Sequence, residues 1–506
     1  MNEPVDILLE TASGTLRGRR HDGLHIFHAV PYAAAPVGPL RFSSPAAAPA
    51  WSGIREAGEA GPIAPQLPSR LSLAMGDFDL PQDEDCLTLT VWAPAAPAAP
   101  RPVLVWFHGG GYISGAGALP WYEGACLARE GDVVVVNVNY RIGALGYLYA
   151  PGISPGNLGL LDQQAALEWV QQNIERFGGD PAQVTWMGQS AGSHSIALLL
   201  ARQAEGAGAP PARRAIMQSA PLGLVLYEPQ QAARIGEVFI RALGIDPDAA
   251  NARELACLVP TRAILDAQTA AFRFVLASAK PGDPVALPFI PTADGTIVPS
   301  SDALPAALQR AATRLDVLIG TTREESNVFY YGVDAVQKLE QAPIPAHEAR
   351  QLGARRPGAT PAQLLMDYSG EQLFLRPTLD WAMQAAQAGR QVYLYQFDWQ
   401  SPNPGLAAGH CLELPFVFGT RAAFAGAPML AGADPRQVDA ISALMRASWL
   451  GFARDGNPNH AGSPPWPPFE PVRRATMRFD VVSGAVGDLA GKAWEVKSFK
   501  TEVCDE

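Results

Sequence analysis

A serine between two glycines is the feature that most constrains how this chain can fold. Residues 184–187 (VTWM) are typical of a buried strand, residues 193–200 (SHSIALLL) are typical of a helix, and GQSAG joins them. A strand that turns this sharply into a helix leaves no space for side chains two residues before and after Ser190, and glycine has no Cβ to clash. The pattern predicts a nucleophile elbow. The alternative is a glycine-rich turn that carries an idle serine.

The bulk composition indicates a packed globular protein. Of 506 residues, 48% are hydrophobic and 17% are charged, and these fractions are typical of a folded chain with a large core. The net charge of −11 argues against nucleic acid as a partner. No apolar run approaches the roughly 18 residues of a membrane span, so we expect none.

The termini and the cysteines bear on the cellular compartment. The first residues, MNEPVD, carry neither a basic segment nor an apolar one, so no signal peptide is visible. Five cysteines occur at wide spacing with no CxxC pair, which favours neither a zinc site nor a disulfide framework. We therefore expect a cytoplasmic protein.

Strand-like and helix-like segments alternate along the chain. Continuous apolar runs, typical of buried parallel strands, lie at 103–107, 133–138, 315–319 and 392–397. Helical spacing occurs at 160–176 and 436–454. This alternation predicts one α/β domain over residues 1–506 with a large, mostly parallel central sheet flanked by helices. Residues 225–310 and 333–390 contain helical stretches but few strand signals, and we expect them to form helical insertions that cap the site.

A nucleophilic serine needs a base, and an acid that orients the base. In the order typical of a nucleophile elbow, the acid and then the histidine follow the serine, each after a later strand. His410 lies about a dozen residues after the strand 392–397, whereas His194 is in the helix next to the elbow, where a packing role is expected. After the strand 315–319 come Glu324 and Glu325, and spacing alone does not choose between them.

A glycine-rich segment directly follows the strand 103–107. The sequence His108-Gly109-Gly110-Gly111 allows the backbone to turn N–H groups toward a substrate oxygen. Such donors stabilise the oxyanion that forms when a nucleophile attacks a carbonyl. The alternative is a plain glycine turn, which the position after a buried strand makes a poor explanation. His108 itself is expected to be structural.

Taken together, these motifs resemble the type-B carboxylesterases, the group that includes the cholinesterases. The resemblance covers most of the chain, and further segments that match are 31–33, 36–38, 40–42, 84–92 (EDCLTLTVW), 139–141, 157–163 and 177–181 (FGGDP). The resemblance implies the α/β-hydrolase fold. It also implies Glu325 as the acid, His410 as the base, and the N–H groups of Gly110, Gly111 and Ala191 as oxyanion donors.

The chain departs from the family pattern in three places. Many members pair the cysteine of the EDCL segment with one upstream, but no cysteine precedes Cys86. Glutamate is common before the nucleophile, where this chain has Gln189. Cholinesterases have a choline-binding tryptophan upstream of EDCL, and residues 52–91 contain none. We therefore expect a choline ester to be a poor substrate.

The function that the sequence favours is a serine carboxylic-ester hydrolase that acts through an acyl-enzyme on small to medium neutral esters. It requires no metal and no cofactor, and its partner is a small-molecule ester. An amide or carbamate hydrolase with the same three residues is the first alternative. A non-catalytic binding module is the second, and it is less favoured because such relatives typically lack part of the triad. Nothing in the sequence indicates the acyl preference, the alcohol preference or the oligomeric state.

Overall fold

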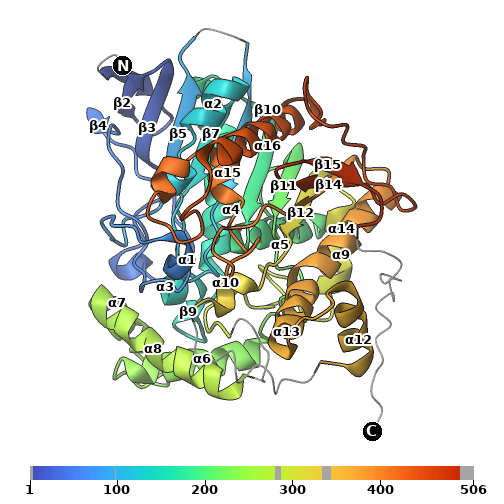
Figure 1. Ribbon diagram of the computed structural model, residues 1–506. Helices are drawn as coiled ribbons and strands as arrows, with labels where there is room; N and C mark the ends of the chain where they lie inside the picture. The colour runs from blue at the N-terminus through green and yellow to red at the C-terminus, as the bar shows by residue number, and fades with distance from the viewer. Residues whose placement is uncertain (1–3, 97–98, 280–285, 333–343, 490–506) are drawn as a thin grey trace.

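A long twisted sheet runs through the centre of the molecule, and helices cover both of its faces (Figure 1). The computed structural model describes residues 4–96, 99–279, 286–332 and 344–489. Within these residues the sheet has 13 strands. They are β1 (Val5–Glu10), β2 (Thr15–His21), β3 (Leu24–Pro31), β4 (Ile54–Glu56), β5 (Thr88–Pro94), β6 (Arg101–Phe107), β7 (Val134–Val138), β10 (Gly179–Gln189), β11 (Arg214–Gln218), β12 (Asp316–Thr322), β13 (Val392–Phe397), β14 (Thr476–Phe479) and β15 (Gly484–Val486). The short strands β8 (Tyr149–Ala150) and β9 (Ser154–Pro155) pair separately.

The central part of the sheet is parallel. The strand order is β1-β2-β3-β5-β7-β6-β10-β11-β12-β13-β14-β15, with β4 beside β2, and every pairing from β7 to β14 is parallel. The predicted mostly parallel sheet is therefore confirmed. Its inner strands were recognisable because helices cover both faces, which makes the strands continuously apolar. In β6, Val103, Val105 and Phe107 join the core on one face, while Leu104 and Trp106 join the core on the other.

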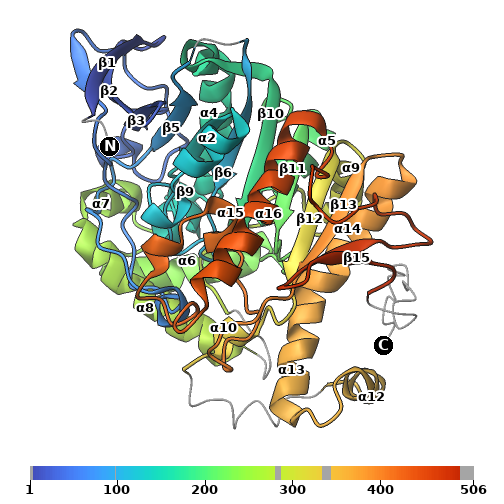
Figure 2. The same ribbon diagram turned by 45° about the horizontal axis from the view of Figure 1, so that its top comes forward.

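Helices form a layer on each side of this sheet, as Figure 2 shows. On one side α4 (Leu158–Asn173), α5 (Ala191–Ala204), α9 (Leu304–Ala312) and α14 (Arg376–Gln387) contribute to the same core as Val103. On the other side α2 (Ala125–Gly131), α15 (Leu414–Phe418) and α16 (Pro435–Asp455) pack with Trp106. Short helices lie in the connecting loops: α1 (Ser72–Met75), α3 (Gly143–Tyr147) and α10 (Asn327–Tyr330).

Both segments predicted as helical insertions contain helices. The first contains α6 (Pro229–Ala242), α7 (Ala252–Leu258) and α8 (Thr261–Ser278). These three helices lie together beyond the ends of the strands (Figure 1) and share a third hydrophobic core. The second holds α12 (Ala346–Arg355) and α13 (Pro361–Gly370), while its residues 333–343 lie outside the described part. Two helices that overlap the predicted segments, α9 and α14, pack on the sheet itself. That these segments cap the site stays a prediction.

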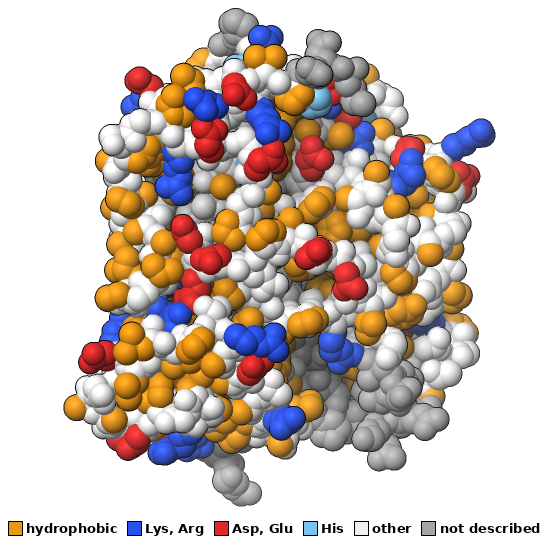
Figure 3. All heavy atoms as spheres, turned by 90° about the vertical axis from the view of Figure 1, so that its left-hand side faces the viewer, with side chains coloured by type: hydrophobic (Ala, Val, Ile, Leu, Met, Phe, Trp, Pro, Cys, Tyr) orange, Lys and Arg blue, Asp and Glu red, His pale blue; other side chains and the backbone are white. Residues whose placement is uncertain are grey.

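The surface carries charges of both signs. On the face in Figure 3, acidic and basic side chains are interspersed with apolar ones rather than gathered into a block of one sign. Among the described residues, no helix is both long enough and apolar enough to cross a membrane.

Candidate active site

Ser190 lies on the sharp turn between β10 and α5. Its backbone has φ 55° and ψ −126°, a conformation that non-glycine residues rarely adopt. A Cβ at Gly188 would be 2.7 Å from the carbonyl carbon of Gly192, and one at Gly192 would be 2.0 Å from the Phe107 oxygen. The two flanking glycines are therefore required by close backbone contacts, as predicted. Strain of this kind is maintained only where the surrounding structure fixes it.

His410 and Glu325 form a buried pair near this turn. His410 follows the loop after β13, Glu325 follows β12, and Nδ1 of the imidazole lies 2.5 Å from Oε2 of the carboxylate. The other carboxylate oxygen, Oε1, accepts a hydrogen bond of 2.8 Å from the N–H of Thr322. Burial alone lowers the pKa of His410, but the neighbouring Cys411 and Glu325 groups outweigh it and hold this pKa well above its ordinary value. A positive charge on His410 is thus stabilised.

Glu324, the other carboxylate that spacing left open, lies away from His410. It accepts a hydrogen bond of 3.1 Å from the N–H of Ala408 and forms an ion pair of 3.2 Å with Arg323. Burial raises its pKa, and the Arg323 charge opposes that rise. The structure therefore brings Glu325, not Glu324, to the imidazole.

The second ring nitrogen of His410 faces Gln189 rather than Ser190. Nε2 of the imidazole lies 3.2 Å from the side-chain nitrogen of Gln189, which also lies 3.4 Å from the Cys411 sulfur. In the neutral imidazole that accepts at Nε2 from this amide, the proton is on Nδ1 toward Glu325. Among the described residues, Ser190 makes no hydrogen bond to His410. Such contacts commonly tighten only when substrate is bound.

The loop after β6 passes directly over the serine. A Cβ at Gly109 would be 3.0 Å from the Cβ of Ser190, and one at Gly110 would be 2.0 Å from the Ser114 oxygen. Gly110 and Gly111 have φ values of 114° and 63°, which favour glycine. In the described part of the chain, the N–H groups of Gly110, Gly111 and Ala191 donate to no other protein group. They therefore have no acceptor within the described part of the protein.

The imidazoles of four other histidines, His108, His194, His347 and His460, have partners other than Ser190. His194 is buried in α5 and its Nδ1 lies 2.9 Å from the Tyr112 hydroxyl, while burial lowers its pKa to about 4. His347 is largely exposed and lies 3.7 Å from Glu348, and His460 contacts its own turn. His108 stacks on Tyr140 at 4.2 Å between ring centroids.

A further carboxylate, Glu413, was not identified from the sequence. It lies close enough to His410 and Glu325 to interact with their charges. Glu413 is fully buried, and its Oε2 has no hydrogen-bond partner among the described residues. Its Oε1 accepts a hydrogen bond of 3.5 Å from Gln218. Burial, together with the negative charge of Glu325, raises the pKa of Glu413 to about 7, although His410 opposes the rise. The one signal in the sequence was its place three residues after His410.

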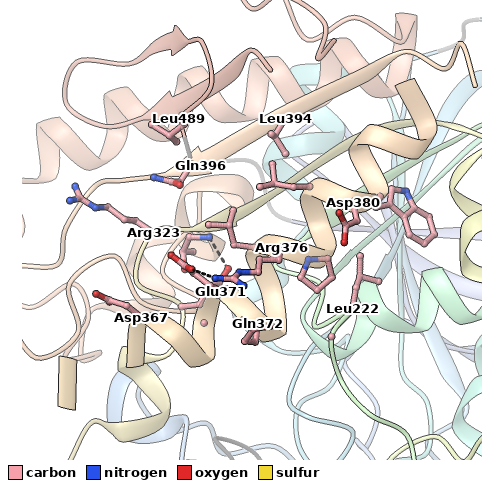
Figure 4. A pocket seen from close by; sticks show the side chains of 18 of the residues that line it. Leu222, Arg323, Asp367, Glu371, Gln372, Arg376, Asp380, Leu394, Gln396 and Leu489 are labelled. Carbon is pink, nitrogen blue, oxygen red and sulfur yellow. Dashed lines mark hydrogen bonds and ion pairs between the residues drawn. The ribbon is translucent and has the colours of Figure 1, made fainter. Parts of the chain in front are cut away.

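Two cavities lie near these residues. A cavity of about 200 Å³ adjoins Gly109, Gly110 and Gln189, and its wall includes Phe78 and Trp121, whose rings meet edge to face at 5.5 Å. Trp121 was not predicted, because it lies outside the segment 52–91 in which a tryptophan was sought. The larger cavity, of about 1360 Å³, is bounded by Glu325 and by the charged side chains that Figure 4 shows, and Ser190 does not line it.

No group of three or more histidine, cysteine or carboxylate side chains in the described ranges has the geometry to hold a metal ion. The site thus consists of a serine on a strained turn, an imidazole bound to a carboxylate, and three free N–H groups.

Comparison with known proteins decides the family. Residues 5–485 match the model of the carboxylesterase family. The chain belongs to this family. Among its relatives is a probable N-octanoylanthranilate hydrolase of Rhodococcus erythropolis, 38% identical over 91% of this chain and 95% of the relative. The phenmedipham hydrolase of Pseudarthrobacter oxydans is 34% identical over 91% and 92%. The crystal structure of a Geobacillus stearothermophilus carboxylesterase matches with a TM-score of 0.80 at 35% identity, covering 96% of this chain and 98% of that one.

This carboxylesterase is a carboxylic ester hydrolase with the α/β-hydrolase fold, so the predicted family, fold and enzyme class are confirmed. The cysteine of its EDCL segment differs from that of many members. Cys86 is a free, fully buried thiol, and burial raises its pKa. A thiol held in its neutral form is a weak nucleophile, so Cys86 serves as a core residue here.

Proposed function

We propose that this carboxylesterase uses Ser190 as nucleophile, His410 as general base and acid, and Glu325 to orient the imidazole. The N–H groups of Gly110, Gly111 and Ala191 hold the oxyanion. The single observation that carries the proposal is the 2.5 Å contact between His410 and Glu325, because it leaves Nε2 of the imidazole as the proton acceptor on the side of the serine turn.

The reaction proceeds in two halves. The Ser190 hydroxyl attacks the ester carbonyl while His410 takes its proton at Nε2, and the carbonyl oxygen becomes an oxyanion. His410 then returns the proton to the alcohol that leaves, and the acyl group stays on Ser190. A water molecule, deprotonated by His410, attacks the acyl-enzyme; His410 then gives that proton to Ser190 Oγ, and the acid is released. Glu325 stabilises the imidazolium in each half.

The substrates we propose are small to medium neutral esters. A cavity of about 200 Å³ beside Gly109 and Gly110 has room for a group of modest size on one side of the ester carbonyl. Gln189 is uncharged, so it offers an ester cation no ionic partner beside His410, and the carboxylate that lines the same cavity is Asp77. We also propose that the enzyme is cytoplasmic, because Cys86 is a free thiol.

Amide or carbamate hydrolysis is a second candidate, and the names of two relatives favour it. One is named a probable hydrolase of N-octanoylanthranilate, which contains an N-acyl bond, and the other is named a hydrolase of phenmedipham, a carbamate. A panel of an ester, a carbamate and an anilide with one acyl group separates these readings. If the enzyme is an esterase, kcat/KM should be highest for the ester. A higher kcat/KM for the anilide or the carbamate would contradict the ester proposal.

The direct test is pre-steady-state kinetics with an activated ester. A burst of alcohol equal to the enzyme concentration supports an acyl-enzyme. A phosphonate should label Ser190 stoichiometrically, and Ser190→Ala should lose both the burst and the label. A Ser190→Ala variant that keeps more than about one hundredth of wild-type turnover overturns the assignment of the nucleophile. The absence of any burst or turnover would favour a non-catalytic binding module.

A further inference from the structure

One turn of the helix that runs from α13 to α14 has an unusual hydrogen-bond spacing. Residues Glu371–Leu375 form a π-helical turn between Gly370 and Arg376. Such a turn inserts an extra residue, which rotates the side chains beyond it by roughly 100° relative to an uninterrupted α-helix. Turns of this kind are uncommon and frequently lie at functional sites.

The turn directs Phe374 onto the imidazole of His410. Phe374 is buried, with 1% of its surface exposed, and its ring centroid lies 4.9 Å from that of His410. Phe329, from α10, lies 5.1 Å from the same imidazole. The two phenyl rings are within 8° of parallel, and the imidazole is inclined at 41° to each of them. Aromatic rings from two separate elements thus restrict the tilt of the imidazole.

The π-helical turn is fixed on its inner side by the backbone. The N–H of Gly223, in the loop after β11, donates to the Leu373 oxygen at 3.0 Å. A Cβ at Gly223 would be only 2.2 Å from the Gln372 oxygen, so the two backbones are in direct contact. At the start of the turn, a Cβ at Gly370 would be 3.6 Å from the Cβ of Glu325.

The outer side of the turn is held by charge. Glu371 forms ion pairs of 2.5 Å with Arg355 and 3.2 Å with Arg376, and Arg376 also pairs with Glu348 of α12 at 2.5 Å. Figure 4 shows Glu371 and Arg376 side by side at the wall of the larger cavity. The turn is therefore anchored between α12 and the loop after β11, and Phe374 has little freedom to move away from His410.

We propose that Phe374 is a positioning residue for His410, and that the π-helical turn exists to place its ring there. Hydrogen bonds at the two ring nitrogens fix the imidazole within its plane, and Phe374 limits motion out of that plane. It also excludes water from one face of the ring. This inference rests on the proposed role of His410 as base, because a general base acts only when its ring nitrogen is held in reach of the proton that it removes.

The test compares Phe374→Leu with Phe239→Leu. Leucine keeps apolar volume but removes the flat ring. Phe239, in α6, is equally buried and packs on Phe289 at 5.5 Å between centroids, so it controls for the loss of a buried phenyl group. We expect kcat of Phe374→Leu to fall about tenfold or more with KM within about threefold, and Phe239→Leu to keep wild-type kcat.

The pH profile separates positioning from simple packing. The titratable groups that face His410 are Glu325, Cys411 and Glu413, and all three stay in place in Phe374→Leu. Water admitted to the imidazole reduces the desolvation that lowers its pKa. The acid limb of kcat/KM should therefore move to higher pH in Phe374→Leu and stay unchanged in Phe239→Leu.

A kcat for Phe374→Leu within twofold of wild type, or an unmoved acid limb, overturns the proposal. Phe329→Leu gives the same test at the second ring that contacts the imidazole, at 5.1 Å between centroids, if Phe374→Leu does not fold. Failure of the proposed function would look different, because His410→Ala would then stay active whatever happens at Phe374.

Discussion

The side-chain nitrogen of Gln189 lies 3.2 Å from Nε2 of His410, the ring atom opposite the one that binds Glu325. The imidazole is thus held between a carboxylate on one side and a neutral amide on the other. Gln189 immediately precedes Ser190, so the amide that contacts this ring nitrogen belongs to the residue next to the proposed nucleophile. The charge of residue 189 therefore acts directly on the proposed base.

We expect Gln189→Glu to move the acid limb of kcat/KM upward by about one pH unit. The new carboxylate faces Nε2 and stabilises the imidazolium, so His410 loses its proton only at higher pH. Gln82→Glu is the matched control, because Gln82 lines the same cavity but is exposed. Equal profiles for Gln189→Glu and wild type would show that the amide does not face the imidazole during turnover.

The wild-type enzyme should prefer a neutral butyrate over butyrylcholine of similar size. A neutral Gln189 gives the choline cation no ionic partner, and no tryptophan occurs in residues 52–91. The measurement is the ratio of the two kcat/KM values. A preference for the choline ester would mean that Phe78 and Trp121, which meet in the smaller cavity, form a cation site with Asp77 of the same wall.

His410→Ala should reduce turnover as severely as Ser190→Ala, since the two residues act as a unit. His194→Ala should leave turnover within a few-fold of wild type, because the buried His194 contacts Tyr112 and its pKa of about 4 keeps it neutral. Steady-state kinetics with melting curves measure both variants. Similar losses at the two positions, with unchanged melting, would contradict the role of His410.

Of the two adjacent carboxylates, Glu325→Gln should lower kcat by at least about a hundredfold. The amide cannot stabilise the imidazolium, and the acid limb should move to lower pH as the pKa of His410 falls. Glu324→Gln should keep kcat within a few-fold, because Glu324 binds Ala408 and Arg323 instead. A larger loss of kcat in Glu324→Gln than in Glu325→Gln would mean that Glu324, not Glu325, orients the imidazole.

Glu413→Gln should make the stability of the enzyme less dependent on pH. The pKa of Glu413 is raised to about 7 from an ordinary value of 4.5, so its contribution to stability is complete below 4.5 and is lost as pH rises through 7. Between pH 5 and 8 the urea midpoint of wild type should fall more than that of Glu413→Gln. Glu470→Gln, at an exposed position, is the control and should follow wild type.

The sequence predicted the framework of the site better than its interior. The strands β6 and β13 were located to within two residues because buried parallel strands are continuously apolar. The need for Gly188 and Gly192 followed from sterics alone. By contrast, Gln189 and His410 are 221 residues apart, and no local pattern reports such a contact. The π-helical turn at Glu371–Leu375 was also missed, because five residues are too few for their apolar spacing to differ from that of an α-helix.

The separation of the site residues along the chain has a consequence for folding. Gly110, Ser190, Glu325 and His410 meet only after β6, β10, β12 and β13 have joined one sheet, and each join closes a loop of many residues. Long-range parallel pairing of this kind is slow, and chains of this length fold through intermediates. Esterase activity should therefore return after helical circular dichroism when the denatured enzyme is diluted into buffer. Turnover is then a reporter of the last step of folding.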